Sequence, residues 1–214
     1  MCANLIKLVA VIFMIGDHAG WRFPLPDYAE YILHTLGATA APVMFFFVGE
    51  GVRYTADVKR YTLRLLAFAA LSEPAYLLFT KGAFKPLNVM FTLALSVMAI
   101  RVLKGEDHAF IKYIYILGFL LLGAFCDWGP VGIVIALVFY TFGRFKALSI
   151  YLIINLGQWL IAKPHDLRSF MGSVVSGMTV AALILMYNKK RGSRRLKYLF
   201  YTVYPLQFLL FLII

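Results

Sequence analysis

Long apolar stretches run through most of the chain, and short polar clusters, glycines and prolines separate them. Because a helix needs about 20 apolar residues to cross the hydrocarbon of a bilayer, these stretches are candidate membrane spans. The pattern predicts nine helices, at residues 4–18, 28–52, 58–80, 88–103, 110–125, 130–142, 147–162, 170–187 and 197–214. The expected fold class is an all-α polytopic integral membrane protein, with residues 1–214 as a single transmembrane domain and no soluble domain.

The second stretch decides whether there are nine spans or ten. It is longer than one straight span requires, and it contains Gly37 and Pro42. Two helices of half its length would each be too short to cross about 30 Å of hydrocarbon, whereas glycine and proline let one helix bend. We therefore interpret it as one kinked or tilted helix. The first stretch lacks a small-residue cleavage site and is interpreted as a retained helix rather than a signal peptide.

The composition also favours a membrane protein. Hydrophobic residues make up 62% of the 214 residues and charged residues only 14%, whereas soluble domains are roughly 45–50% apolar and about 25% charged. A soluble fold of this composition would expose far larger apolar patches than the few hundred Å² usual for monomers. The expected surroundings are a lipid bilayer, and nine spans leave no residues for a separate catalytic or nucleic-acid-binding domain.

The basic residues predict the orientation of the chain. The formal net charge is +11, from 21 Lys and Arg against 10 Asp and Glu, and nine spans place 16 of the basic residues on one side and five on the other. Lysine and arginine concentrate in cytoplasmic loops, so the N-terminus is predicted to be cytoplasmic and the C-terminus external. This explanation of the charge needs no nucleic-acid partner. Cys2 and Cys126 have no paired spacing, so we expect neither a metal site nor a disulfide.

Ionisable side chains inside predicted spans are candidate functional residues, because a charge at the bilayer centre costs at least about 2.5–3.5 kcal/mol. The polar groups at membrane depth are Asp17 with His18, Glu50 with Arg53, Ser72 with Glu73, and Asn88. A histidine beside a carboxylate can act as a general base. Since consecutive helical residues point about 100° apart, Asp17 and Glu73 are both candidate partners of His18. His34, His108 and His165 lack comparable neighbours and are interpreted as structural.

Arginines gather near the predicted cytoplasmic ends of the second and third spans. Arg60 and Arg64 lie four residues apart on one helix face, and Arg53 precedes them. Arginine presents forked donors that match phosphate oxygens, so this face suits a phosphate-bearing ligand; a solvated helix start is the alternative. Further candidates near and within the last span are Arg191, Tyr201 and Tyr204, although membrane-interface aromatics alone would explain the tyrosines.

The order of the motifs resembles the TraX family of membrane acetyltransferases over nearly the whole chain. The segments that carry the resemblance are MIGDHAG, GATAAPVMFFFVGEGVRYTADVKRYTLRLLAFAALSEPAY, NVMFTLALS, DWGPVGIVI, YNKKRG and KYLFYTVYPLQ. The resemblance implies a multi-pass protein of the bacterial cytoplasmic (inner) membrane. It also implies acetyl-CoA as the acyl donor, and an activity typified by N-acetylation of the amino terminus of a conjugative pilin.

The same resemblance implies functional residues. It identifies His18 as the catalytic histidine with Asp17 beside it, and it implicates as pocket residues Glu50, Arg53, Arg64, Ser72, Glu73, Asn88 and Tyr204. Two positions depart from the family pattern: a usual glycine–arginine pair reads Gly37-Ala38, and a usual histidine after Tyr-Pro-Leu is Gln207. A change of substrate or a loss of activity would arise at these positions.

We expect direct transfer of an acetyl group from cytoplasmic acetyl-CoA to an amine or hydroxyl acceptor, a peptide N-terminus or a glycan, at the outer side. His18 would deprotonate the acceptor, while Asn88 or a tyrosine would stabilise the oxyanion. The alternative from another class is a proton- or ion-coupled transporter with a relay of Asp17, His18, Glu50 and Glu73. A third possibility is a non-enzymatic membrane assembly factor. Binding of acetyl-CoA discriminates between the transferase and the transporter.

The predicted topology has a direct test. In a background that lacks Cys2 and Cys126, a Ser193→Cys variant should resist a membrane-impermeant thiol reagent added outside, because the loop at residues 188–197 is predicted to be cytoplasmic. Labelling of intact and permeabilised cells measures this. Labelling of Ser193→Cys from outside would contradict the nine-span topology.

Overall fold

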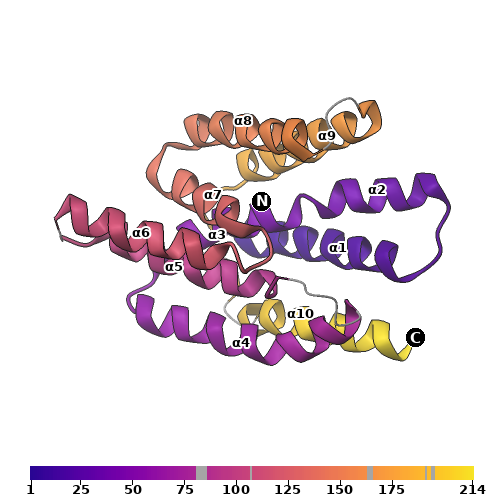
Figure 1. Cartoon of the computed structure of the whole chain (residues 1–214), viewed down its shortest axis with the longest axis horizontal. Coiled ribbons are helices and arrows are strands. Elements are labelled where there is room, and N and C mark those ends of the chain that lie inside the picture. Colours follow the sequence, from indigo (N-terminus) through magenta and orange to yellow (C-terminus); the bar gives the residue numbers. More distant parts are fainter. Residues whose placement is uncertain (81–85, 107, 163–165, 191, 194–195) are drawn as a thin grey trace. The chain divides into compact units, whose positions relative to one another are not determined.

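All secondary structure in the described part of the chain is helical (Figure 1). The computed structural model describes residues 1–80, 86–106, 108–162, 166–190, 192–193 and 196–214. The helices are α1 (Ala3–Arg22), α2 (Asp27–Gly37), α3 (Ala40–Tyr54), α4 (Val58–Phe79), α5 (Val89–Lys104), α6 (Ala109–Gly123), α7 (Gly129–Thr141), α8 (Arg144–Ala162), α9 (Leu167–Leu185) and α10 (Leu196–Ile213). The predicted all-α fold class is therefore confirmed.

Several helices have the length and composition of membrane spans. Five stretches of the described chain are long and apolar enough to cross a bilayer: α1, α2 together with α3, α4, α8 and α9. Shorter apolar helices lie at Ala109–Gly123, Gly129–Thr141 and Tyr198–Ile213. Many of their leucines, isoleucines and phenylalanines are exposed, which suits helices whose solvent is lipid. The count of nine spans stays a prediction.

The long second stretch is interrupted rather than continuous. The structure ends α2 at Gly37 and begins α3 at Ala40, between the glycine and the proline that predicted a kink. The Thr39 hydroxyl donates to the carbonyl of Leu36 at 2.7 Å, which satisfies one of the last carbonyls of α2. Two short helices thus replace the single kinked helix that we predicted, within one apolar stretch, Asp27–Tyr54.

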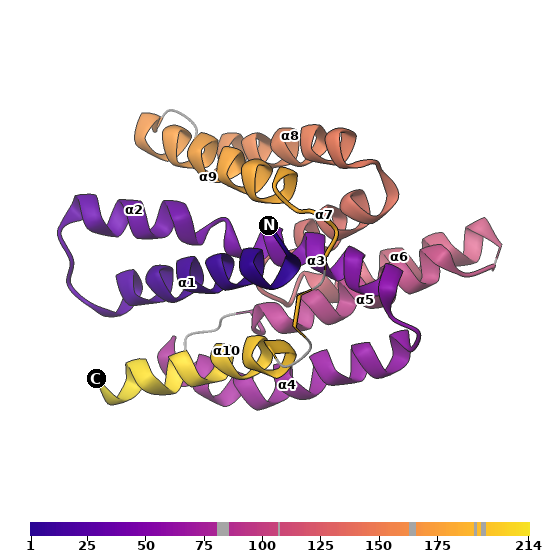
Figure 2. The ribbon, with the colours of Figure 1, turned by 180° about the vertical axis from the view of Figure 1, so that it is seen from behind.

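The helices form two compact units, each built from distant parts of the chain. The first unit combines Met1–Met44 with Thr141–Arg194 and holds α1, α2, α8 and α9; the second combines Phe45–Tyr140 with Arg195–Ile214. In the first unit, α1 and α2 run side by side as an antiparallel pair, as do α8 and α9 (Figures 1 and 2), and α2 also packs on α9. In the second, α4 packs between α10 and α5, and α5 also packs on α6.

Glycines bring α1 and α2 into close contact. Gly16 and Gly20 are spaced as Gly-x-x-x-Gly, the spacing that lets membrane helices approach closely. A Cβ at Gly16 would lie 3.1 Å from Leu33, and one at Gly20 would lie 3.1 Å from the imidazole of His34. Across the interface, a Cβ at Gly37 would lie 2.2 Å from the Cβ of Asp17. The contact therefore requires glycine.

The N-terminus of α1 is attached to the segment that follows α9. The backbone amide of Ala3 donates to the carbonyl of Lys190 at 2.8 Å, and the Asn4 amide donates to the carbonyl of Ser193 at 2.7 Å. Both segments thus lie on the same side of the first unit. This agrees with the predicted topology, in which both are cytoplasmic.

The α1–α2 contact predicts an unequal response to two glycine substitutions. Gly37→Ala should lower the free energy of unfolding by about 1–3 kcal/mol, because the new methyl group overlaps Asp17 and the helices must separate. Gly157→Ala on α8 is the matched control, because its methyl group would meet no atom within 4 Å. Thermal unfolding of both variants in detergent measures the difference. Equal unfolding temperatures would contradict the close packing of α1 on α2.

Candidate functional site

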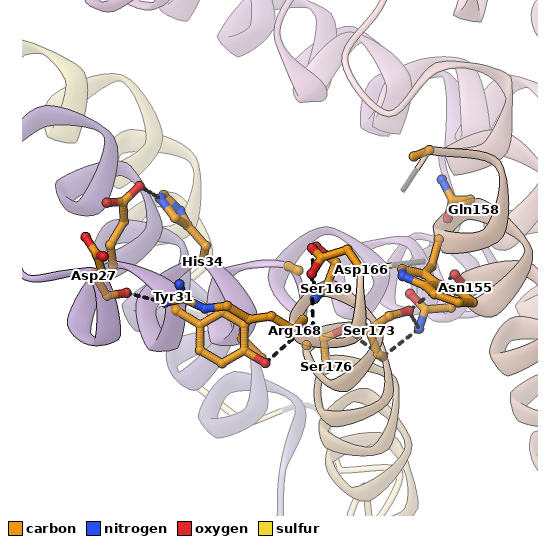
Figure 3. Close-up of a pocket in the computed structure, with 16 residues that line it drawn as sticks. Asp27, Tyr31, His34, Asn155, Gln158, Asp166, Arg168, Ser169, Ser173 and Ser176 are labelled. Carbon is orange, nitrogen blue, oxygen red and sulfur yellow. Dashed lines mark hydrogen bonds and ion pairs between the residues drawn. The ribbon is translucent and has the colours of Figure 1, made fainter. Parts of the chain in front are cut away.

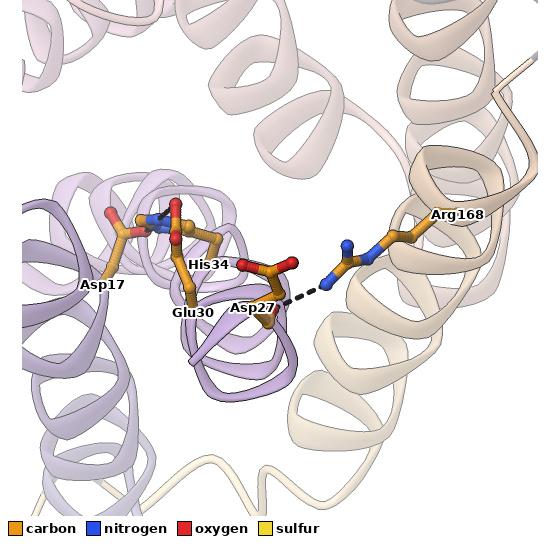
Figure 4. A network of polar contacts seen from close by, with 5 residues as sticks. All are labelled: Asp17, Asp27, Glu30, His34 and Arg168. Carbon is orange, nitrogen blue, oxygen red and sulfur yellow. Dashed lines mark hydrogen bonds and ion pairs between the residues drawn. The ribbon is translucent and has the colours of Figure 1, made fainter. Parts of the chain in front are cut away.

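A histidine–carboxylate pair joins α1 to α2. Oδ1 of Asp17 lies 2.6 Å from Nδ1 of His34, and the two side chains are 26% and 24% exposed. An ionised carboxylate only accepts hydrogen bonds, so Nδ1 donates to Asp17. One helical turn before His34, Oε1 of Glu30 lies 3.5 Å from Nε2 (Figure 4). The Trp21 ring, with its centroid 4.6 Å from that of His34, packs against the imidazole.

This pair corrects the interpretation of His34 as a histidine without acidic neighbours. Glu30 precedes it by four residues on the same helix, a spacing that places side chains together, and the sequence pattern already contained this signal. Asp17 reaches His34 only through packing of α1 on α2. The partner of its carboxylate is therefore His34. From the sequence we had expected Asp17 to be a candidate partner of His18 only. His18 lies half-buried on α1 and follows Asp17 directly.

A cavity of about 660 Å³ opens beside His34, between α2, α8 and α9 (Figure 3). Its lining residues include Glu30 and His34 from α2, and Asn155 and Trp159 from α8. The Asn155 amide donates to the carbonyl of Ser173 at 2.8 Å and to its hydroxyl at 3.0 Å. Nε1 of Trp159 is buried and has no hydrogen-bond partner within the described chain.

At the rim of the cavity, Arg168 at the start of α9 contacts residues of α2. Its Nη2 donates to the carbonyl of Asp27 at 2.6 Å, and its guanidinium lies 4.6 Å from the centre of the Tyr31 ring. The Tyr31 hydroxyl donates to the Arg168 carbonyl at 3.0 Å, and Asp166 caps α9 by accepting from the amides of Arg168 and Ser169. The sequence analysis missed these residues because they lie more than 130 positions apart along the chain and share no motif.

Asn88 and Glu73 form a polar centre in the second unit. Asn88 is fully buried, and its side-chain oxygen caps α5 by accepting from the amide of Met90 at 3.0 Å. Its amide nitrogen donates to Glu73 at 2.6 Å and to the carbonyl of Ala69 at 2.9 Å. Both amide hydrogens are therefore engaged, and none remains to stabilise an oxyanion.

Ser72 and Tyr204 lie near this centre. The Ser72 hydroxyl donates to the carbonyl of Phe68 at 2.6 Å and lies 3.9 Å from the sulfur of Met90 on α5. Tyr204 on α10 is 5% exposed, and its hydroxyl makes a hydrogen bond with the backbone of Val89, the residue that follows Asn88. The structure thus brings together four sequence candidates: Ser72, Glu73, Asn88 and Tyr204.

Glu50 and Arg53 form an ion pair on α3 that contacts α7. Nη1 of Arg53 donates to Oε1 of Glu50 at 2.6 Å, and Nη2 donates to the carbonyls of Phe139 and Tyr140 at the end of α7. The guanidinium also lies 5.1 Å from the centre of the Tyr140 ring. A cation that donates hydrogen bonds to a helix's terminal carbonyls stabilises the C-terminus of that helix. Arg53 therefore ties α3 to α7.

The remaining arginines differ from Arg53. Arg60 is exposed, with Nε 3.5 Å from Asp57 at the start of α4. Nε of Arg64 is buried and has no hydrogen-bond partner among the described residues, and its guanidinium lies 5.9 Å from the centre of the Tyr61 ring. Tyr201 on α10, a further candidate binding residue from the sequence, stacks on Phe68 of α4 with ring centroids 5.0 Å apart. Arg191 and His165 lie outside the described residues.

The two positions that depart from the family pattern have different surroundings. Ala38 lines the cavity beside His34. Gln207 on α10 is 4% exposed, and neither polar atom of its side chain has a hydrogen-bond partner among the described residues. The departure at Ala38 therefore lies at an exposed position on the cavity wall, and the departure at Gln207 lies at a buried position.

Comparisons with known proteins agree with the resemblance in the motifs. The family described as "TraX protein" matches residues 2–214. The "Probable fimbrial assembly protein FimC, serogroup H1" of Dichelobacter nodosus is 29% identical over 220 residues, which cover 94% of this chain and 90% of that protein. No solved structure matches the chain significantly. This protein belongs to the TraX family.

Proposed function

We propose that this protein is a membrane-embedded acetyltransferase of the bacterial cytoplasmic membrane. It transfers an acetyl group from cytoplasmic acetyl-CoA to an amine or hydroxyl, on a peptide N-terminus or a glycan, at the outer side. The observation that carries the proposal is that a carboxylate and two histidines, Asp17, His18 and His34, gather where α1 packs on α2, because such groups are suited to proton transfer. The name of the D. nodosus relative, a probable fimbrial assembly protein, favours the N-terminus of a surface-fibre subunit as acceptor.

The proposed reaction is a direct transfer without an acyl-enzyme. His18 removes a proton from the acceptor as its nitrogen or oxygen attacks the thioester carbonyl. A new bond to the acetyl carbon forms and the carbon–sulfur bond breaks. The proton taken up by His18 passes to the leaving thiolate, so that coenzyme A is released as the thiol. Asn88 is not assigned the role of oxyanion donor, because its amide hydrogens are engaged by Ala69 and Glu73. Ser72, Glu73 and Asn88 act by positioning the ends of α4 and α5, next to Tyr204.

The proposed donor site lies at Arg64. A buried guanidinium nitrogen without a partner is costly unless a ligand supplies an acceptor, and the phosphates of coenzyme A are such acceptors. Arg60, one turn earlier on α4, and Tyr201 are further proposed contacts, together with Arg191. Glu50 contributes indirectly, because it fixes Arg53 at the end of α7. No metal ion is needed for this reaction.

If Arg64 binds the donor, its replacement should selectively weaken the binding of acetyl-CoA. Arg64→Ala should weaken acetyl-CoA binding about 10- to 100-fold, which corresponds to the loss of one hydrogen bond between charged groups. Arg60→Ala should weaken it less, because its side chain is exposed and screened by water. Calorimetry with the purified protein in detergent measures both affinities. An absence of acetyl-CoA binding to the unmodified protein would favour the ion-coupled transporter instead.

If His18 is the general base, its replacement should lower the rate of acetyl transfer without weakening the binding of acetyl-CoA. His18→Ala should lower acetyl transfer by about 10²–10⁴-fold, the usual contribution of a positioned general base, while acetyl-CoA affinity stays unchanged. His108→Ala is the control, since His108 is exposed and its side chain makes no capping bond. Release of coenzyme A in proteoliposomes measures the rates. If His18→Ala keeps more than about a third of the activity, the general base is another residue.

A further inference from the structure

We propose that the cavity between α2, α8 and α9 is the acceptor site, and that His34 and Glu30 bind the acceptor's amino group there. This inference rests on the proposed function, because it identifies the cavity's ligand with the molecule that receives the acetyl group. It adds His34, Glu30 and Trp159 as binding residues, none of which the sequence motifs indicated.

His34 and Glu30 face each other as two acceptors. Asp17 engages the Nδ1 hydrogen of His34, so Nε2 of the neutral imidazole is the acceptor of the ring. That nitrogen is buried, and no described residue donates a hydrogen bond to it. Its neighbour at 3.5 Å is Oε1 of Glu30, and an ionised carboxylate has no hydrogen to donate. A ligand that donates two hydrogen atoms from one nitrogen satisfies both. A primary amine does this, whereas a single hydroxyl donates only one.

The charge around the cavity also favours an amine. Four of the chain's ten acidic residues are there, although the chain as a whole carries a net charge of +11. Asp27, Glu30 and Asp166 line the cavity, and Asp17 lies behind His34. Arg168 is the one lysine or arginine among the described lining residues, and it is engaged by Asp27 and Tyr31. An ammonium group is therefore attracted to this site, and the phosphates of a coenzyme are repelled.

Trp159, on α8 in the same cavity, suggests what is attached to the amine. Its Nε1 is a buried donor that lacks an acceptor among the described residues, and its ring packs on Phe170 with centroids 4.9 Å apart. In a peptide, the first carbonyl oxygen lies two bonds from the carbon that carries the amino group, and such an oxygen is an acceptor for the indole hydrogen. A cavity lined by His34, Glu30 and the donor of Trp159 therefore suits a peptide N-terminus better than a sugar hydroxyl.

The predicted topology places this cavity where the acceptor is expected. With a cytoplasmic N-terminus, α2 begins, α8 ends and α9 begins at the outer side of the membrane. The lining residues Glu30, Trp159 and Arg168 belong to these three helix ends. A peptide exposed outside the cell therefore reaches the cavity without crossing the bilayer.

The test measures binding of small probes to the full-length protein in detergent, without acetyl-CoA. Alanylglycinamide should bind, whereas N-acetylalanylglycinamide, which lacks the amine, should bind at least tenfold more weakly. Glucosamine, an amine without a peptide carbonyl, should be intermediate, and methyl glucoside should not bind. Glu30→Gln and Trp159→Phe should each weaken alanylglycinamide binding about fivefold or more. Glu106→Gln, a change at an exposed acidic residue between α5 and α6, should leave it unchanged.

Kinetics separate this proposal from the proposed function. In acetyl transfer to alanylglycinamide, Glu30→Gln and Trp159→Phe should raise the KM for the peptide more than they lower kcat, with acetyl-CoA affinity unchanged. Transfer with an unchanged peptide KM in both variants would overturn the cavity as acceptor site while the transferase stands. Selective binding of alanylglycinamide without any acetyl transfer would overturn the transferase while the amine site stands. Equal binding of methyl glucoside and alanylglycinamide would overturn recognition of the amine.

Discussion

The contact between Asp17 and His34 depends on how closely α1 approaches α2. A carboxylate at membrane depth is costly unless it is paired, and the imidazole at 2.6 Å supplies that partner. The pair forms because Gly16, Gly20 and Gly37 leave no side chains between the helices. The same packing turns Nε2 of His34 toward Glu30. Helix packing through glycine thus produces both the stability of the hairpin and the chemistry at its end.

The two units of the protein each have a polar centre with a different character. In the first unit, His34 and Trp159 have polar atoms without hydrogen-bond partners in the described chain. The second unit also has such atoms, on Arg64 and Gln207. In its polar centre, however, Asn88 makes a hydrogen bond with each of its polar side-chain atoms, and Arg53 donates to a carboxylate and to two carbonyls. Unsatisfied buried groups are costly and suit ligands, whereas satisfied ones stabilise the fold. This contrast is why we assign the acceptor to the first unit and structural roles to Asn88 and Arg53.

The sequence predicted the helices better than it predicted the partners of polar residues. Hydrophobic runs identified the all-α fold and membrane helices because span length depends on local composition alone. The proximity of Ser72, Glu73, Asn88 and Tyr204 was indicated by the motifs. The partner of Asp17 was not, because it depends on which faces of α1 and α2 meet. The spacing of Glu30 and His34, four residues apart, could be read from the sequence. It indicated a functional site only once the structure showed that Asp17 also contacts His34.

The central claim is that the protein transfers acetyl groups across the membrane. An assay of the purified protein with the donor on one side of the membrane and the acceptor on the other tests this claim most directly. Proteoliposomes would enclose isotopically labelled acetyl-CoA, and alanylglycinamide would be added outside. With the N-terminus of the protein oriented inward, labelled N-acetylalanylglycinamide should accumulate outside while free coenzyme A accumulates inside. Labelled product that forms only when both substrates are on the same side, or no product from protein that binds both, would contradict the account.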